Sequence, residues 1–301
     1  SDETVSTIER AIGSDGDCIV LDHGGYFSLN PNTLKVFKPN MISGIAEYAI
    51  NGENRYLNST VNDRPMISIG RLSIKKKSDF ASSDSIMLVS ELYLQNEGIM
   101  LFGDDIKVGI IGHGTLGGRI RYLLQERGVK NFLVYDIDEK KLNDIALENI
   151  APHKTELLKQ CDVLFCATGN KAITKEDLKF LKDGAIILTV TSPDDELDLP
   201  ALKKQKLVQL KTEKCREQTF IYSISETGHE LVLPFDGESP NTQISFGIAD
   251  ASIHQPCATH IVAGIRLMQG CAEHKTGMHA LSLKDELMVE QVWDEHFKSL
   301  A

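Results

Sequence analysis

The spacing of hydrophobic and polar positions changes along the chain, and the change is clearest between Ile106 and Asp138. A short apolar run from Val108 to Ile111 leads directly into the glycine-rich sequence GHGTLG, which predicts a buried strand and a tight turn. Apolar residues then recur at helical spacing up to Arg127, and Phe132 to Tyr135 is apolar again. The pattern therefore predicts a strand, a turn, a helix and a second strand.

The same alternation continues through the middle of the chain. Further strands are predicted at residues 162–166, 185–190, 208–210, 220–224 and 230–233, with a helix at 175–181. Strands that alternate with helices predict a parallel sheet, whose ligands bind at the carboxyl ends of the strands. Several small or polar residues are expected at such ends: Thr168, Gly169, Asn170, Thr191 and Ser192.

The flanking segments are less regular. Residues 18–21 predict a strand that ends at the sequence Asp22-His23-Gly24-Gly25, and residues 39–50 predict a helix. The polar stretch 51–82 is interpreted as an interdomain connection. Helices are predicted at 86–100, within 247–270, and at 281–297.

These elements predict an α/β protein. Its main part would be a Rossmann doubly wound parallel sheet, accompanied by a second, smaller, truncated substrate-type domain. The expected bounds are 1–80 for the partial substrate-type domain and connection, 81–265 for the Rossmann domain, and 266–301 for a C-terminal helical segment.

The glycine-rich turn has the composition of a dinucleotide-binding turn. Gly112 would permit the tight turn, Gly114 would let the backbone approach a pyrophosphate, and Gly117 would let helix and strand pack closely. The N–H groups at the start of the helix would bind the phosphates. The alternative is a strand-to-helix turn in a Rossmann domain that has lost its cofactor.

Asp136 ends the second strand of this unit, where an acid is expected to bind the adenosine ribose. Its carboxylate would accept hydrogen bonds from the ribose diol and repel a 2′-phosphate, which favours NAD over NADP. Other residues are expected to line the same cofactor site: His113, Thr115, Leu116, Ile137 and Val190.

Composition excludes several classes of function. The net charge of −11 argues against a nucleic-acid surface, and the run Lys75-Lys76-Lys77 is interpreted as a solvated loop. No apolar run reaches membrane-spanning length. The six cysteines form no CxxC pair and no signal peptide is evident, so we expect reduced thiols and a cytoplasmic protein. His254 and His260 would lie on different helical faces, so no metal site is expected.

Longer motifs resemble those of the S-adenosylhomocysteine hydrolase family. The sequence IVLDHGG, which contains Asp22 and His23, is similar to the family's ILDDGG. Thr168-Gly169-Asn170 with the following Ile173 resembles its TGN motif, and residues 192–198, SPDDELD, resemble its GHFDxEID. The spacing of Gly237, Asn241 and Gly247 is similar to its EGxxxNxxxxxG. The chain resembles a divergent member that lacks the family's N-terminal third.

The resemblance implies tightly held NAD that oxidises a ribose hydroxyl and later returns the hydride. It implies that Asn241 contacts the nicotinamide carboxamide, and it suggests Lys76 and Asp79 as catalytic residues, with His23 as a third candidate. His23 is alternatively a turn histidine with no role in catalysis. Residues that move protons in the family are altered here, at His23, Asn40, Ser192 and Ile248.

The leading hypothesis is an NAD-dependent oxidoreductase on a hydrolase-like fold that oxidises an alcohol of a small polar substrate, for example a nucleoside. The alternatives are a divergent S-adenosylhomocysteine hydrolase and a non-catalytic NAD-binding homologue. The expected partners are a small-molecule substrate and a second copy of the chain, with no nucleic acid and no membrane. Light scattering at micromolar concentration would test the expected dimer.

Overall fold

The computed structural model describes residues 10, 18–29, 42–61, 63–103, 105–191, 193–214, 218–244, 250–270 and 276–297. The chain forms two compact units. The first unit combines Ser1–Ser78 with Ala249–Ala301, and the second unit is Asp79–Ile248. These bounds differ from the expected domains, because residues 249–265 belong with the N-terminal segment rather than with the Rossmann sheet.

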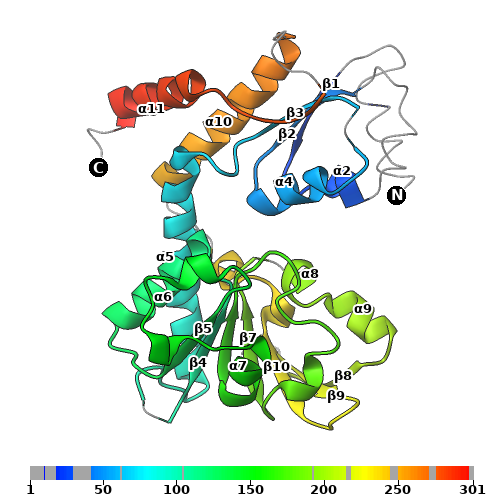
Figure 1. The fold of residues 1–301 in the computed structure, drawn as a ribbon, viewed down its shortest axis with the longest axis vertical. Coiled ribbons are helices and arrows are strands. Elements are labelled where there is room, and N and C mark those ends of the chain that lie inside the picture. The colour runs from blue at the N-terminus through cyan, green and yellow to red at the C-terminus, as the bar shows by residue number, and fades with distance from the viewer. Residues whose placement is uncertain are drawn as a thin grey trace. The chain divides into compact units, whose positions relative to one another are not determined.

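The second unit is built on a seven-stranded sheet (Figure 1). Its strands are β4 (Val108–Ile111), β5 (Phe132–Tyr135), β6 (Val163–Cys166), β7 (Ala185–Thr189), β8 (Val208–Lys214), β9 (Thr219–Ile224) and β10 (Glu230–Pro234). Their order is β5-β4-β6-β7-β10-β9-β8. The first five run parallel, and β9 and β8 continue the sheet as an antiparallel edge. The predicted Rossmann-type α/β fold is confirmed.

Helices bury both faces of this sheet. They are the long α5 (Ser73–Asn96), α6 (Thr115–Glu126), α7 (Lys154–Gln160), and the short α8 (Pro193–Glu196) and α9 (Leu199–Lys204). Two separate hydrophobic clusters result, and the strand residues Leu164 and Phe165 are fully buried in opposite ones. Strands that are buried on both faces need continuous apolar runs, which is the pattern of VGII, VLFC and AIILT in the sequence.

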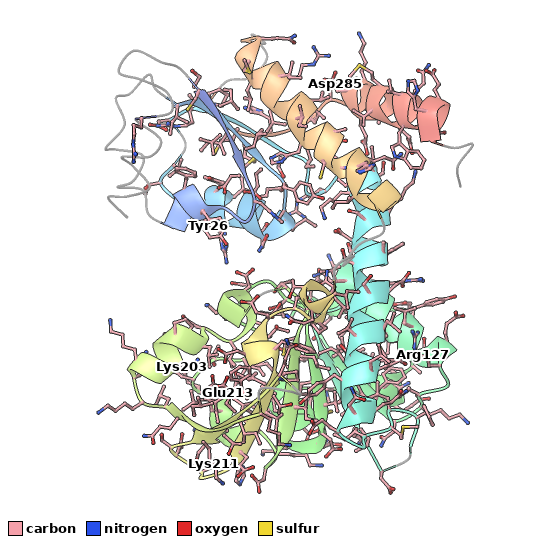
Figure 2. The ribbon with its side chains drawn as sticks, turned by 180° about the vertical axis from the view of Figure 1, so that it is seen from behind. Tyr26, Arg127, Lys203, Lys211, Glu213 and Asp285 are labelled. Atoms are coloured by element: carbon pink, nitrogen blue, oxygen red, sulfur yellow. The ribbon has the colours of Figure 1, made fainter. Side chains whose placement is uncertain are left out.

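The end of α6 is fixed to α5 by charge. Arg127, labelled in Figure 2, places its Nε 2.5 Å from the Glu91 carboxylate. Arg119 forms a second pair with Asp84 at 2.9 Å. The helix that begins at the glycine-rich turn is therefore attached at two places along its length.

The first unit has a parallel sheet of its own, in the order β1-β2-β3-β11. Its strands are β1 (Cys18–Asp22), β2 (Ile42–Glu47), β3 (Pro65–Ser68) and β11 (Gly277–Ala280). Alternate strand residues face two clusters: Ile45 packs with Tyr56 of α4 (Ile50–Leu57), whereas Ala46 packs with Ala263 of α10 (Asp250–Met268). Helices thus cover both faces of this sheet as well.

The last helix, α11 (Leu283–Phe297), packs against α10. Arg266 Nε lies 3.0 Å from the carboxylate of Asp285, which Figure 2 labels. The 266–301 segment is not purely helical, because β11 pairs with β3 between the two helices. Among the described residues, no helix combines the length and apolarity needed to cross a membrane.

Three other predictions of secondary structure are wrong. The described part of 39–50 contains β2 instead of a helix, because pairing with β1 and β3 outweighs the helical spacing of its apolar residues. The stretch 51–82 is not only a connection, since it holds most of α4, all of β3 and the start of α5. The helix predicted at 175–181 is reduced to a 3-10 turn, Leu178–Phe180.

Candidate functional site

Two of the three glycines in the predicted dinucleotide turn are required by the fold itself. Gly112 has φ +96°, and a Cβ there would lie 2.7 Å from the carbonyl oxygen of Ala167. A Cβ on Gly117 would overlap the carbonyl oxygen of Gly112. Helix α6 and the ends of β4 and β6 therefore approach as closely as their backbones allow.

Gly114 is different, because packing within the protein does not explain it. A Cβ added at this position meets nothing within 4 Å. Gly114 is the N-cap of α6, its φ is −82°, and no side chain caps the helix. The first N–H groups of a helix have no partner within the helix. The structure thus leaves open space above a helix N-terminus, as an anionic ligand needs.

Asp136 lies at the end of β5, beside the turn, and is buried. One carboxylate oxygen accepts the N–H of His113 at 2.7 Å, and the other accepts the N–H of Asp138 at 2.9 Å. Lys141 Nζ lies 3.5 Å from the first oxygen. Asp136 therefore also holds the glycine turn in place. The next residue, Ile137, is 89% exposed, which is unusual for an isoleucine and leaves an apolar surface beside the acid.

His113 is engaged inside the protein rather than aimed at a ligand. Its Nδ1 lies 2.7 Å from the carbonyl oxygen of Lys141, so Nδ1 carries a proton and donates it. Its Nε2 then accepts from Arg121 Nε at 3.3 Å. The side chain of His113 ties the turn to the segment after β5, which is a structural role.

The residues at the ends of β6 and β7 are gathered by one buried carboxylate that the sequence did not single out. Glu196, at the end of α8, accepts the hydroxyl of Thr168 at 2.7 Å, the N–H of Gly169 at 2.7 Å and the hydroxyl of Thr191 at 2.8 Å. Burial raises the pKa of Glu196, and the hydrogen bonds that it accepts act against that rise. The expected ligand-facing residues Thr168, Gly169 and Thr191 are thus brought together.

Asn241 is held near the end of β7 by a sharply bent segment. Phe235 and Asp236 have φ of 59° and 51°, a region that residues other than glycine rarely adopt. After this bend, the Thr189 hydroxyl donates to the Gly237 carbonyl. The Ser239 hydroxyl lies 2.8 Å from Asn241 Oδ1. With Oδ1 accepting, the amide nitrogen of Asn241 keeps its two donors for other groups.

The first unit has a comparable arrangement at the carboxyl edge of its sheet. The carboxylate of Glu47, at the end of β2, accepts the N–H groups of Gly24 and Gly25 at 2.9 Å each and of Ala49 at 2.7 Å. Its strand neighbour Asp22 accepts the Tyr56 hydroxyl at 2.5 Å. Burial outweighs the three hydrogen bonds and raises the pKa of Glu47 to about 7. Both carboxylates shape the loop that carries His23.

An aromatic cluster lies beside this loop. The ring of Tyr48 has its centre 4.8 Å from that of His23, 5.5 Å from that of His260, and 4.8 Å from Lys75 Nζ. Partial burial lowers the pKa of His23, and Lys75 lowers it further. Burial also lowers the pKa of His260, whose Nε2 donates to the Ala46 carbonyl at 2.9 Å. Both imidazoles are therefore neutral near pH 7 and able to accept a proton.

The lysine that joins this cluster is Lys75, whereas the sequence singled out Lys76. Lys76 is exposed, and Lys77 pairs with Glu290 at 2.8 Å. Asp79, the other catalytic candidate, is half-buried on α5 one turn after Lys75. Spacing within the lysine run could not decide which of the three faces the sheet, because that depends on where α5 begins.

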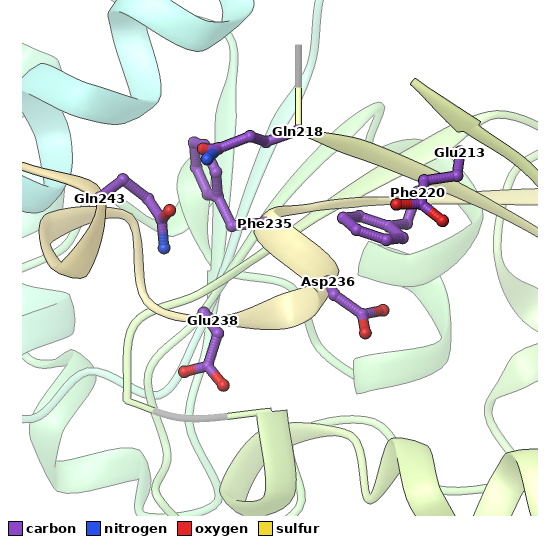
Figure 3. A pocket seen from close by; sticks show the side chains of 7 residues that line it. All are labelled: Glu213, Gln218, Phe220, Phe235, Asp236, Glu238 and Gln243. Carbon is purple, nitrogen blue, oxygen red and sulfur yellow. The ribbon is translucent and has the colours of Figure 1, made fainter. Parts of the chain in front are cut away.

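A separate cavity of ≈ 290 Å³ lies in the second unit near the bend at Phe235 (Figure 3). It is lined by Glu213, Gln218, Phe220, Phe235, Asp236, Glu238 and Gln243. Asp236 already accepts the Tyr222 hydroxyl at 2.5 Å and pairs with Lys203 at 3.5 Å. None of the residues that the sequence predicted for the cofactor site lines this cavity.

Four positions used in the sequence comparison lie outside the described residues: Asn40, Ser192, Gly247 and Ile248. The other predicted cofactor residues are placed in the second unit. Thr115 and Leu116 form the first turn of α6, and Val190 follows β7, where its carbonyl lies 3.2 Å from the Ser239 hydroxyl. Asn170 donates its N–H to the Thr168 hydroxyl at 3.0 Å.

No protein-family model matches the chain. Among solved structures, it is similar to D-2-hydroxyisocaproate dehydrogenase, with 16% identity, a TM-score of 0.37, and coverage of 67% of this chain and 64% of that one. It is also similar to a phosphoglycerate oxidoreductase from Vibrio cholerae o395, with 17% identity, a TM-score of 0.44, and coverage of 68% and 69%. The match thus spans less than two thirds of the first of these proteins. Neither is an S-adenosylhomocysteine hydrolase.

Proposed function

We propose that the protein is an NAD-dependent oxidoreductase that oxidises an alcohol of a small polar substrate. The observation that carries the proposal is the open space at Gly114, above the uncapped start of α6 and beside Asp136. Packing explains the other two turn glycines but not this one. A bound pyrophosphate would explain why position 114 is a glycine, because only glycine lets the phosphate oxygens reach the helix N–H groups.

The residues around the turn fit NAD. The N-terminus of α6 would hold the pyrophosphate, Asp136 would accept the ribose hydroxyls, and the exposed Ile137 would cover one face of the adenine. Thr168, Thr191 and Asn241, at the ends of β6 and β7, would hold the nicotinamide part. The remaining cofactor candidates, Asn170 and Val190, support this part through their backbone.

Bound NAD would accept the hydride of the alcohol carbon. The chain's own groups must take the hydroxyl proton, and a neutral histidine does this well near pH 7. We assign this role to His23, whose pKa is lowered by partial burial and by Lys75. The catalytic role suggested by the sequence for Lys76 is assigned here to Lys75, and Asp79 remains a catalytic candidate on the same helix.

The proposal predicts that Gly114→Ser weakens NAD binding without weakening the fold. Serine is a favoured N-cap residue and tolerates the backbone found here, so the melting temperature should be kept or raised. Its side chain would occupy the space required by the phosphates, and NAD affinity should fall by about tenfold or more. Calorimetry with NAD and thermal melting test both points. Unchanged NAD affinity would remove the main support for the proposal.

We expect NAD to bind about tenfold more tightly than NADP, because a 2′-phosphate would lie against the buried carboxylate of Asp136. Asp136→Ala is a poor test, since it also frees the His113 and Asp138 N–H groups. Lys141→Met is cleaner: it removes the cation 3.5 Å from Asp136 and should weaken NADP further while sparing NAD. Equal or tighter NADP binding by the wild type contradicts the prediction.

A divergent S-adenosylhomocysteine hydrolase is the second candidate, supported by the sequence motifs alone. We expect no efficient homocysteine release, because proton-transfer positions of the family are occupied by His23, Asn40, Ser192 and Ile248. Each missing acid or base typically costs about 10²–10⁴-fold in rate. A thiol-release assay tests this, and turnover typical of an efficient enzyme would favour the hydrolase.

NADH formation with another alcohol would separate an oxidoreductase from a binding-only homologue.

A further inference from the structure

We infer that Glu196 is a positioning residue that turns the hydroxyls of Thr168 and Thr191 into hydrogen-bond acceptors toward the ligand. This edge of the site therefore takes ligand groups that donate hydrogen bonds, such as the hydroxyls of a ribose, and disfavours anions. The inference rests on the proposed dinucleotide function, and it adds which chemical group of the ligand lies at which end of the site.

The carboxylate of Glu196 is completely buried, since 0% of the residue is exposed. Its Oε2 accepts from Thr168 Oγ1 at 2.7 Å. Its Oε1 accepts from Gly169 N at 2.7 Å and from Thr191 Oγ1 at 2.8 Å. The backbone of the same residue accepts the Ile173 N–H at 3.0 Å, which fixes the whole of α8 against this edge.

A hydroxyl has a single proton to donate and two lone pairs to accept with. In the structure both hydroxyls donate to the Glu196 carboxylate, so Thr168 and Thr191 each use their single proton there. Gly169 spends its N–H in the same way. Thr168 accepts the Asn170 N–H at 3.0 Å, which uses one of its lone pairs. What the exposed Thr168 and the half-buried Thr191 can offer to a ligand is lone pairs.

The glycine turn offers the opposite polarity. The first turn of α6 presents N–H donors beside Gly114, with no capping side chain. Donors suit the oxygens of a pyrophosphate, whereas acceptors suit hydroxyl groups. The second unit thus has a donor end at the turn after β4 and an acceptor pair, Thr168 and Thr191, at the ends of β6 and β7. A dinucleotide matches this order when its phosphates lie on the turn and its second ribose lies on the threonines.

The test uses three probes on the full chain: ADP, ADP-ribose and NAD, measured by calorimetry. ADP lacks the second ribose, and the other two carry it. In Glu196→Gln, the amide group donates toward one threonine, so that hydroxyl must turn its proton elsewhere. We expect affinity for ADP-ribose and NAD to fall by about tenfold while ADP affinity stays within about twofold. If the substitution instead distorted the whole binding site, the affinities for all three probes would fall equally.

Thr191→Val gives a second route that leaves the buried carboxylate in place. It should weaken ADP-ribose and NAD but not ADP, and the double variant with Glu196→Gln should be no weaker than the worse single variant. Equal weakening of ADP, or no change in any probe, overturns the role of Glu196. Wild-type protein that binds none of the three probes overturns the proposed function itself, which is a different result.

Discussion

Gly117→Ala is expected to lower the free energy of unfolding of the second unit by about 2–4 kcal/mol. The added Cβ would overlap the carbonyl oxygen of Gly112 and lie 3.3 Å from the Cβ of Ala167. Gly112 is itself confined by Ala167 and has a positive φ, so the turn cannot move away without breaking its packing. Strand β4 and helix α6 would have to separate.

Hydrogen exchange of the β4 and β6 amides measures this destabilisation within the unit. Gly114→Ser is the matched control, because it adds a side chain to the same turn where a Cβ meets nothing within 4 Å. The two variants should both weaken NAD binding, but only Gly117→Ala should speed exchange of the sheet amides. A Gly117→Ala protein as stable as the wild type would show that the turn is looser than the structure describes.

The second large effect concerns Glu47, whose pKa burial raises from 4.5 to about 7. A raised pKa means that the folded protein holds this proton more tightly than the unfolded chain does. The contribution is fully present below about pH 4.5 and is lost as the pH rises through about 7. The loss amounts to about 3 kcal/mol of unfolding free energy for the first unit.

Hydrogen exchange of the Ile45 and Ala46 amides, measured from pH 4 to 8 and corrected for intrinsic rates, reports the stability of this sheet. Glu47→Gln keeps the side-chain shape and does not titrate. It leaves one of the three N–H donors facing an amide nitrogen, so the variant should be less stable at low pH but should lack the decline of the wild type. If the unfolding free energies of the wild type and of Glu47→Gln changed with pH in parallel, the hydrogen bonds would outweigh burial and keep the pKa of Glu47 low.

The sequence predicted the βαβ unit well because all its signals are local. Val108–Ile111 and Phe132–Tyr135 are strands at the predicted bounds, and α6 ends one residue before Arg127. Apolar runs, a glycine turn and a helical stripe occur there within one continuous segment, so no distant contact is needed to interpret them.

The first unit was predicted poorly because its strands depend on distant partners. The sequence of β2, ISGIAE, is favoured as a strand only because β1 and β3 pair with it on both sides. Strand β11 lies beyond α10 in the chain and pairs with Pro65–Ser68. The start of α5 is polar on most faces, so its hydrophobic pattern gives no sign of a helix before Ile86.

The candidate site shows the same division. Gly112, Gly114, Gly117 and Asp136 are proposed as site residues from their spacing along one segment. Glu196 and Glu47 were not, because a buried carboxylate is identified by the donors around it, and those donors come from other loops. Acidic residues are mostly exposed, so the sequence favours a surface position for both.

Amide chemical shifts, recorded while NAD is added to the wild-type protein, test whether the glycine turn of the second unit holds NAD. We expect the largest shifts at Gly114, Thr115 and Leu116, with further shifts at Thr168, Thr191 and Asn241. Shifts confined to the cavity near Phe235, or no shifts at saturating NAD, would contradict this expectation.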